Sequence, residues 1–407
     1  MTVHPVPAPG DRRRFPMYTQ EFAADPHAAY RRMRDEYGAL VPVELHPERN
    51  ATLVVDHAMA LRILNDPVSF PADPREWQQT VPADCPLLPM IGYRENALRS
   101  AGREHARYRA SNVDALRGVA LHEVERTVRR AARRSINRFC ARGEADFLNE
   151  FAKPVVLGSI SDMAGAPNQL ARRIGTSMKA VFEGGADAEQ ANNVLMKALQ
   201  DLINLKRACP DDDLVTRLIQ HESALTDPEL AQQLVTVFGA GYEPTTNTIA
   251  NTELRIQTSA QVMDGVSSGA LSIREALDEG LFSDPPMANY CLSYPPRAVV
   301  MDDHQVLLAH QPVVISLAAC NNDPALGGLE QRLGNRAHLA FSTGPHACPA
   351  ADMSMIIAQA ALDEVTEALP DMRLAISPDE VRWRPGPFHR ALAALPVSFA
   401  PTPPLTD

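Results

Sequence analysis

Apolar positions recur at the spacing of a helix along most of this chain. The pattern is most sustained between residues 103 and 369, where apolar side chains return every three to four positions. Helices are therefore expected over Ala106–Leu121, His122–Arg142, Ala145–Ala164, Ala186–Arg207, Asp211–His221, Asp227–Thr258 and Ser272–Leu281. The fold should be mainly helical.

Strand patterns are short and lie near the two ends of the chain. Ahead of the helical stretch, the spacing predicts a helix over Pro26–Tyr37, a strand over Ala51–Asp56 and a helix over His57–Asn65. A strand pair is expected in Ala298–Leu308 and Pro312–Leu317. Val381–Phe399 predicts a terminal hairpin that turns at Pro-Gly-Pro. The expected fold class is α+β, mainly α with small β-sheets.

Two segments lack this regularity. Phe70–Leu98 contains five prolines and no sustained period, so it predicts a long irregular loop. Such loops in compact proteins are commonly functional. The first 20 residues are also rich in proline and predict a flexible N-terminal arm.

Composition narrows the function. The chain has 407 residues, 45% of them hydrophobic, which is enough for a core that encloses a ligand. Its 39 Lys and Arg against 50 Asp and Glu give a net charge of −11, which argues against a general nucleic-acid or anionic-membrane binder. No apolar run approaches the roughly 18 residues of a membrane span, and the charged N-terminus is unlike a signal peptide. A cytoplasmic protein is expected.

One of the six cysteines stands apart from the others. The six are widely spaced with no Cys-x-x-Cys pair, so neither a disulfide framework nor a structural zinc site is expected. Cys348 lies between a Gly-Pro turn and a long helical pattern. The positive end of that helix would stabilise a thiolate, so this sulfur could be a nucleophile or a metal ligand.

The residues before Cys348 form the pattern Phe-x-x-Gly-x-His-x-Cys-x-Ala. Its matching positions are Phe341, Gly344, His346 and Cys348. This pattern resembles the haem-binding loop of the cytochrome P450 family, in which the cysteine thiolate is the axial iron ligand. Ser342 and Ala350 stand where glycines are commonest in that loop.

A second resemblance lies about a hundred residues upstream. Val237–Asn247 resembles the oxygen-activating helix of the family, with Ala240, Gly241 and Glu243 on the expected positions. Two small residues there would allow a flat macrocycle to approach the backbone. The resemblance implies that the haem lies between this helix and the helix that follows the cysteine.

Further residues resemble the groups that hold the haem propionates. His105 and Arg109 form a His-x-x-x-Arg pair, and residues four apart share one helix face. His338 matches another propionate contact, and Arg297 is a third candidate although the local spacing shifts. Asn321-Asn322-Asp323-Pro324 resembles the Asn-Arg-Asp-Pro corner of the family.

The chain departs from the family at a structural ion pair. The Glu-x-x-Arg motif is present as Glu279-Gly-Leu-Phe282, so phenylalanine replaces the arginine. A buried glutamate without its arginine would be costly. Glu279 is therefore expected to find another donor, for which Arg332 is a candidate, or to be protonated.

The second departure concerns catalysis. The family threonine that guides protons to iron-bound dioxygen is replaced by Pro244, which has no hydroxyl and kinks a helix. Thr245 and Thr246 follow, and with Glu243 they are the catalytic candidates. Three outcomes stay open: Thr245 takes over, the substrate supplies the hydroxyl, or peroxide replaces dioxygen and electrons.

The resemblance spans residues 20 to 400 and implies an atypical cytochrome P450. Residues 21–407 would form a single domain that binds haem b and oxidises a hydrophobic small molecule, by hydroxylation or a related monooxygenation, in specialised metabolism. Its electrons would come from a ferredoxin and an NAD(P)H-dependent reductase. The basic run Arg129, Arg130, Arg133 and Arg134 is a solvated helix face or a docking site for that ferredoxin. The alternatives are an impaired haem-binding partner in a signalling complex and a peroxide-dependent variant.

Overall fold

The computed structural model describes residues 14–183, 188–301, 305–327 and 336–406. These residues divide into two units, each assembled from segments that are distant in sequence. Unit 1 contains the described residues of Met1–Ala106, Leu281–Cys348 and Trp383–Ala391. Unit 2 contains those of Arg107–Gly280, Pro349–Arg382 and Leu392–Asp407.

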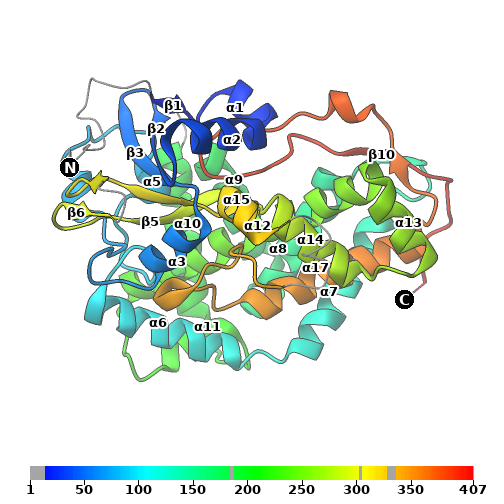
Figure 1. Cartoon of the computed structure of the whole chain (residues 1–407). Coiled ribbons are helices and arrows are strands. Elements are labelled where there is room, and N and C mark those ends of the chain that lie inside the picture. Colours follow the sequence, from blue (N-terminus) through cyan, green and yellow to red (C-terminus); the bar gives the residue numbers. More distant parts are fainter. Residues whose placement is uncertain (1–13, 184–187, 302–304, 328–335, 407) are drawn as a thin grey trace. The chain divides into compact units, whose positions relative to one another are not determined.

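Unit 1 is built on a five-stranded sheet in the order β1-β2-β3-β8-β5 (Figure 1). The strands are β1 (Phe15–Pro16), β2 (Leu40–His46), β3 (Arg49–Val54), β8 (Val313–Ser316) and β5 (Asn289–Ser293). Neighbouring pairs are antiparallel at β2–β3 and β5–β8, and parallel at β1–β2 and β3–β8. The predicted strands at Ala51–Asp56 and Pro312–Leu317 are therefore confirmed as β3 and β8.

The helices of unit 1 are short and clearly capped. They are α1 (Gln20–Ala24), α2 (Pro26–Tyr37), α3 (His57–Leu64), α4 (Arg75–Gln78), α5 (Leu88–Ile91) and α15 (Leu317–Asn321). Helix α2 has the predicted bounds because Asp25 caps its start and Gly38, at φ +74°, ends it. Phe70–Leu98 is irregular apart from α4 and α5, as predicted.

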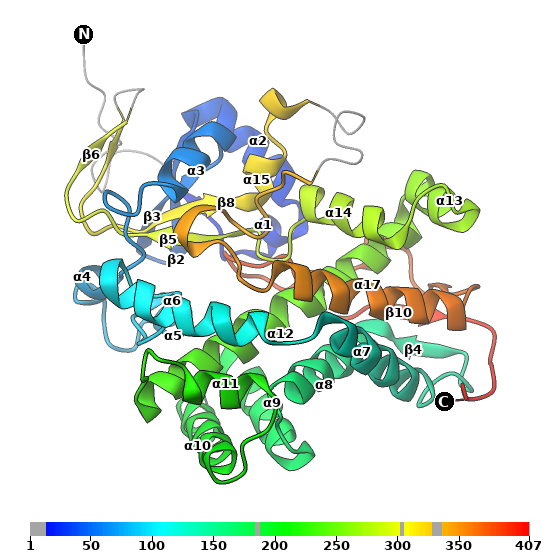
Figure 2. The same cartoon turned by 90° about the horizontal axis from the view of Figure 1, so that it is seen from below.

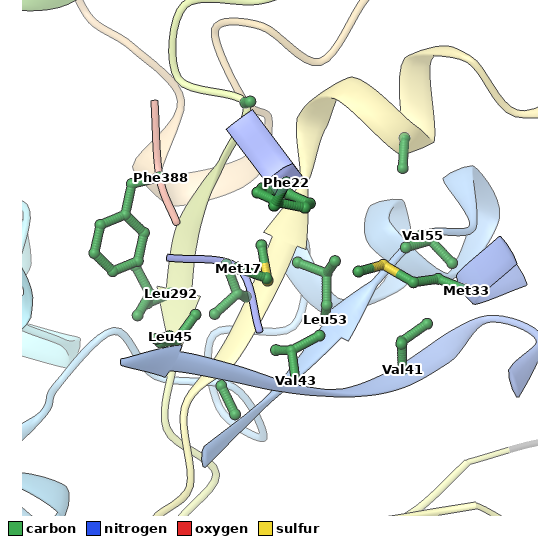
Figure 3. Close-up of a cluster of buried hydrophobic side chains, with 14 of the residues drawn as sticks. Met17, Phe22, Met33, Val41, Val43, Leu45, Leu53, Val55, Leu292 and Phe388 are labelled. Carbon is green, nitrogen blue, oxygen red and sulfur yellow. The ribbon is translucent and has the colours of Figure 1, made fainter. Parts of the chain in front are cut away.

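Apolar side chains from distant segments fill the core of unit 1. Figure 3 shows Val43 of β2, Leu53 of β3 and Leu292 of β5 with Met17 and Phe388 in one cluster. Residues 1–13 of the expected N-terminal arm lie outside the described residues. From Phe15 the chain already pairs with β2, and the Met17 side chain is fully buried.

Unit 2 is mainly helical. Its helices are α7 (Leu121–Ile136), the π-helix η1 (Phe147–Ala152), α8 (Lys153–Met163), α9 (Asn168–Glu183), α10 (Ala188–Ala208), α11 (Leu214–Gln220), α12 (Asp227–Thr258), α13 (Ala260–Ser268) and α17 (Ala351–Ala368). Figure 2 shows α17 with α7 and α12, which both pack against it. Two further helices, α6 (Gly102–Arg117) and α14 (Ile273–Ser283), contribute residues to both units.

Most of the predicted helices are confirmed, and α12 has the predicted bounds. Its N-terminus carries a capping box between Thr226 and Glu229, followed by proline in the first turn. The single helix predicted over Ala145–Ala164 is wrong at its start: β4 (Glu144–Asp146) and η1 precede α8. The Glu144–Asp146 backbone pairs with β10 (Pro396–Ser398) instead of continuing a helix.

The predicted C-terminal hairpin is only partly confirmed. The Arg384 N–H donates to the Ala391 carbonyl at 2.9 Å, which closes a turn around Pro-Gly-Pro. Strand β10, however, pairs antiparallel with β9 (Arg373–Leu374) and β4. The short hairpin of β6 (Val299–Val300) and β7 (Val306–Leu307) confirms the strand pattern in Ala298–Leu308. Among the described helices, none has a stretch long and apolar enough to cross a bilayer.

Candidate active site

The segment Leu339–Cys348, here called the Cys loop, folds back on itself in unit 1. The Cys348 N–H donates to the Phe341 carbonyl at 2.8 Å, and the Ala347 N–H donates to the Gly344 carbonyl at 3.1 Å. The Cys348 side chain is exposed. Helix α17 begins three residues later with no side chain capping its first N–H groups. Negative charge on the sulfur would therefore be favoured just before a positive helix end.

The loop requires two residues in the left-handed backbone region. Gly344 has φ +72°, and a Cβ there would lie 2.3 Å from the Leu64 carbonyl oxygen, so only glycine fits. Ser342 has φ +59°, which explains why glycine is commonest at its position in the family loop. Ala350 has φ −112°, an ordinary value for any residue. Of the two departures, only Ser342 strains the backbone.

The structure brings together two of the predicted haem-binding residues, one from the propionate pair and one from the Cys loop. The rings of His105 on α6 and His346 in the Cys loop lie with their centroids 4.1 Å apart. Both residues belong to unit 1, although 241 positions separate them in the sequence. Arg109 lies one turn after His105 on the same face of α6. Three donor groups predicted from separate motifs thus derive from α6 and one short loop.

The aromatic residue that replaces the family arginine packs beneath this loop. Phe282 is 3% exposed, and its ring meets the His338 ring edge-on at 5.4 Å. His338 in turn lies 5.8 Å from Phe341 of the Cys loop. Phe282 therefore supports His338, another predicted propionate ligand, by ring packing rather than by an ion pair.

Two asparagines tie the end of α14 to the start of the Cys loop. Asn321 is fully buried, donates to the Leu281 carbonyl at 3.0 Å and accepts from the Leu339 N–H at 2.7 Å. Asn322 donates to the carbonyls of Phe282 at 3.3 Å and Ser283 at 3.0 Å. The family motif places arginine at position 322, so this chain changes two arginines together. The Asn321–Asn322 clamp holds the backbone beside the lost arginine.

Glu279 has a different cationic partner from the one expected. Arg255 of α12 donates from Nη2 to Glu279 Oε1 at 2.6 Å, and its Nε also contacts the carboxylate. Arg332, the candidate named from the sequence, lies outside the described residues. The predicted second donor thus exists, and within unit 2 it comes from α12.

On α12, the two small residues serve different purposes. A Cβ on Gly241 would lie 3.2 Å from Ile160 Cδ1 of α8, so glycine allows these two helices to pack closely. Ala240 is exposed. The close approach of a flat cofactor, expected from the sequence for both positions, fits the surface at Ala240.

The acid of α12 shares a face with Ala240. Ala240, Glu243 and Asn247 are three and four positions apart, so they lie along one side of the helix. The Asn247 amide donates to Glu243 Oε1 at 3.4 Å, and Glu243 is partly exposed. Pro244 lies within the helix and removes one backbone donor. Asn247 is a polar partner of the acid that the sequence analysis missed.

The two threonines lie elsewhere on α12. The Thr245 hydroxyl is hydrogen-bonded to the Ser354 hydroxyl of α17 at 3.0 Å, and its side chain is 3% exposed. Thr246 is fully buried, and its hydroxyl has no hydrogen-bond partner within the described residues. Thr245 follows Glu243 by two residues and so lies on another face of α12, whereas Thr246 lies one turn after Glu243 with its side chain fully buried.

Arg297 does not contact the residues around Cys348. It lies exposed in the turn between β5 and β6. Within the described part of unit 1, no hydrogen bond, ion pair or ring contact joins Arg297 to the Cys loop. A buried arginine of the same unit, Arg99, is a residue that the sequence analysis did not identify.

The donors around Cys348 fit a porphyrin-bound iron. Nowhere in the described residues do three or more His, Cys, Asp or Glu side chains converge to hold a bare metal ion. A single exposed thiolate matches an iron whose remaining protein-independent ligands belong to a macrocycle. The nearby histidines supply donors for the carboxylates of such a group. Bound haem-thiolate iron would supply oxygen activation, in which the sulfur favours O–O cleavage.

Known proteins resemble the chain over nearly its whole length. No protein-family model matches it. Cytochrome P450 107B1 of Saccharopolyspora erythraea is 28% identical over 398 residues, which cover 93% of this chain and 96% of that protein. Cytochrome P450 monooxygenase PikC of Streptomyces venezuelae is 28% identical over 395 residues, covering 93% and 92%.

Solved structures match the fold. CYP154C4 from a Streptomyces species superposes with a TM-score of 0.87 at 25% identity, over 96% of this chain and 99% of that one. CYP154A1 from Streptomyces coelicolor gives a TM-score of 0.84 at 23% identity, over 95% and 100%. With a Cys loop of the matching sequence pattern and relatives aligned over 93% of the chain, the protein is similar in sequence and fold to the cytochrome P450 haem-thiolate monooxygenases.

Proposed function

We propose that this cytochrome P450 holds haem b through Cys348 and monooxygenates a hydrophobic small molecule of specialised metabolism in the cytoplasm. The observation that carries the proposal is the Cys loop, whose N–H to carbonyl bond at Cys348 and Phe341 fixes an exposed thiol before a positive helix end. Its sequence pattern is that of the family ligand loop. Residues 21–407 would act as one domain.

The proposed propionate ligands are His105, Arg109, His338, Arg297 and His346. The neighbouring rings of His105 and His346 support the first and last of these, because two imidazoles with centroids 4.1 Å apart can donate to one carboxylate group. Phe341 and Gly344 would line the proximal side by shaping the loop. Ala240, exposed on α12, would lie against the macrocycle, while Gly241 allows α12 to pack closely against α8.

Proton transfer is proposed to depend on Glu243. Its carboxylate accepts a hydrogen bond from the amide of the buried Asn247, and Glu243 shares the exposed side of α12 with Ala240. Thr245 is proposed as a positioning residue because its hydroxyl is bonded to Ser354. The Thr246 hydroxyl is a second proton-transfer candidate, since it is buried without a partner among the described residues.

The names of several relatives indicate the class of substrate. One relative, 24% identical over 397 residues, is a 2-hydroxy-5-methyl-1-naphthoate 7-hydroxylase of Streptomyces carzinostaticus. Another, 27% identical over 309 residues, is the mycinamicin IV hydroxylase/epoxidase of Micromonospora griseorubida. We propose a substrate of comparable kind, a largely apolar ring system made by specialised metabolism.

A ferredoxin and an NAD(P)H-dependent ferredoxin reductase are the proposed electron donors. The basic run on α7 contributes less net positive charge to the surface than the sequence alone indicates. Arg129 and Arg133 both pair with the buried Glu364 of α17, at 3.3 Å and 2.5 Å. Arg134 is exposed and remains the residue of this run best placed to meet an acidic partner.

The absorption spectrum of the reduced protein under carbon monoxide tests the proposal. The purified protein should give a far-red-shifted Soret band, and Cys348→Ala should abolish it. Cys209→Ala is the matched control, since Cys209 is also an exposed cysteine and should leave the band unchanged. A band that survives in Cys348→Ala would refute thiolate ligation by this residue. Haem binding without substrate turnover by ferredoxin or peroxide would refute the monooxygenase proposal.

A further inference from the structure

Arg99 is an almost fully buried arginine in unit 1. It follows the irregular Phe70–Leu98 segment, just before α6, and is 3% exposed. Its Nη2 donates to the Met90 carbonyl and to the Tyr290 hydroxyl, and its Cζ lies 5.0 Å from the centre of the Tyr290 ring. These contacts fix the side chain, but none of them neutralises its charge.

No described carboxylate pairs with this guanidinium. Of the acids near Arg99 in sequence, Glu95 is exposed and Glu104 pairs with Arg75, as does Asp73. Burying an arginine without a counter-charge destabilises the folded protein by roughly several kcal/mol. Nη2 makes both of these hydrogen bonds, so the donors on Nε and Nη1 can contact another group.

A second cation, Arg94, adds to the positive charge that a bound anion would neutralise. Burial, and after it the positive charge of Arg99, lowers the pKa of Arg94. Two neighbouring cations in a poorly solvated place favour the binding of an anion. A planar carboxylate suits the forked geometry of arginine particularly well.

The location connects Arg99 with the Cys loop. Cys291, next to Tyr290 on β5, has its thiol pKa raised by burial, and the charges of Arg99 and Cys348 both act on it. The Cys291 thiol also interacts with the Ser342 hydroxyl. Arg99 therefore lies on the side of unit 1 that presents the Cys loop, where haem and substrate are expected.

We propose that Arg99, with Arg94 beside it, forms a binding site for a ligand carboxylate. The carboxylate is either a haem propionate or an acidic group of the substrate, and both present the same chemistry to the guanidinium. The inference deepens the proposed function by giving the buried arginine a ligand role. It also rests on haem binding beside the Cys loop.

A binding cycle with acid and ester probes separates the two sources. Apoprotein is titrated with haem and with haem dimethyl ester, and holoprotein with lauric acid and methyl laurate. Arg99→Gln should weaken binding of one acid form by about tenfold to a hundredfold while hardly changing its ester. Loss confined to haem identifies the propionate, and loss confined to lauric acid identifies a substrate carboxylate. Arg103→Gln, at an exposed position on α6, is the control and should change neither.

Equal losses for acid and ester, or no loss with either pair, would overturn the proposal. If Arg99→Gln does not fold, Arg99→Lys keeps the charge without the fork and should give a smaller loss that is still specific for the acid. The carbon monoxide spectrum of each variant is recorded in parallel. A normal thiolate band with no acid-specific loss rejects the role of Arg99 and leaves the haem-thiolate proposal standing.

Discussion

The hydroxyls of Thr245 and Ser354 are 3.0 Å apart and join α12 to α17 inside unit 2. Thr245 follows the proline that occupies the position of the proton-guiding threonine, so it is the nearest hydroxyl in sequence to replace it. Its engagement with Ser354 indicates a packing role. The acid on the open face of α12 is Glu243, held by Asn247.

Thr245→Val should therefore destabilise the protein without uncoupling dioxygen consumption from product formation. Valine keeps the shape but leaves the Ser354 hydroxyl without its bond, at a cost of about 1–3 kcal/mol. The thermal midpoint should fall, while product formed per dioxygen consumed should stay near wild type. Glu243→Gln should instead lower product yield by about a hundredfold.

Thr248→Val is the matched control for the threonine. The Thr248 hydroxyl bonds back to the Pro244 carbonyl at 2.9 Å on the same helix. Thr248→Val should leave the product formed per dioxygen consumed unchanged. It should change the free energy of unfolding by no more than about 1 kcal/mol. If Thr245→Val releases peroxide in place of product, the threonine carries the proton after all and the packing role is rejected.

The Asn321–Asn322 clamp should control thiolate ligation. Asn321→Ala removes two buried hydrogen bonds, to Leu281 and Leu339, and should lower the free energy of unfolding by about 2–4 kcal/mol. Because Leu339 begins the Cys loop, the fraction of reduced protein with the red-shifted carbon monoxide band should fall as well. That spectroscopic change is the readout that distinguishes loop positioning from general destabilisation.

Two further variants sharpen this test. Asn321→Asp keeps an acceptor for the Leu339 N–H and should recover part of the thiolate band. Asn204→Ala changes an exposed asparagine on α10 and should leave the band intact. Destabilisation of Asn321→Ala with an unchanged band would mean that the clamp does not position the Cys loop.

Arg255 should take the stabilising role of the missing family arginine. Arg255→Ala removes the α12 cation that pairs with Glu279, whose side chain is 10% exposed, and should cost about 3 kcal/mol of stability. Adding Phe282→Arg to that variant places a new cation three residues after Glu279 on α14, where it can pair. The double variant should recover stability relative to Arg255→Ala. If Phe282→Arg further destabilises the Arg255→Ala protein, Arg255 does not replace the family arginine as the partner of Glu279.

The sequence predicts the parts of this protein that depend on local signals. Helix α12 has the predicted ends because its capping box and proline act within one turn. Phe341, Gly344 and Cys348 could be identified because the ligand loop is a contiguous pattern. Arg255 and Glu279, by contrast, pair between two helices with no local signature of the contact.

The same limit applies to Arg99 and to η1. Arg99 is a single arginine after an irregular segment, and only the burial created by distant β5 makes it notable. The π-helix at Phe147–Ala152 has an ordinary helical pattern of apolar residues, so periodicity alone predicts an α-helix there. Tertiary pairing with β10 decides where that helix begins.

A buried acid on α12 should make stability depend on pH. Burial raises the pKa of Glu253 to about 7 from its ordinary 4.5, while the Gln257 hydrogen bond at 2.7 Å and the Arg373 charge oppose the rise. The folded state therefore holds the proton more tightly than the unfolded state. This contribution to stability is complete below pH 4.5 and is lost as the pH rises through about 7.

The difference of 2.5 pKa units between 4.5 and 7 corresponds to about 3 kcal/mol. Glu253→Gln cannot ionise, so its free energy of unfolding should exceed that of wild type at about pH 8 and match it more closely at about pH 5, measured by urea titration. Glu367→Gln, at an exposed position on α17, is the control and should keep the wild-type slope. A Glu253→Gln protein with the same pH slope as wild type would show that this carboxyl is not what makes stability fall towards alkaline pH.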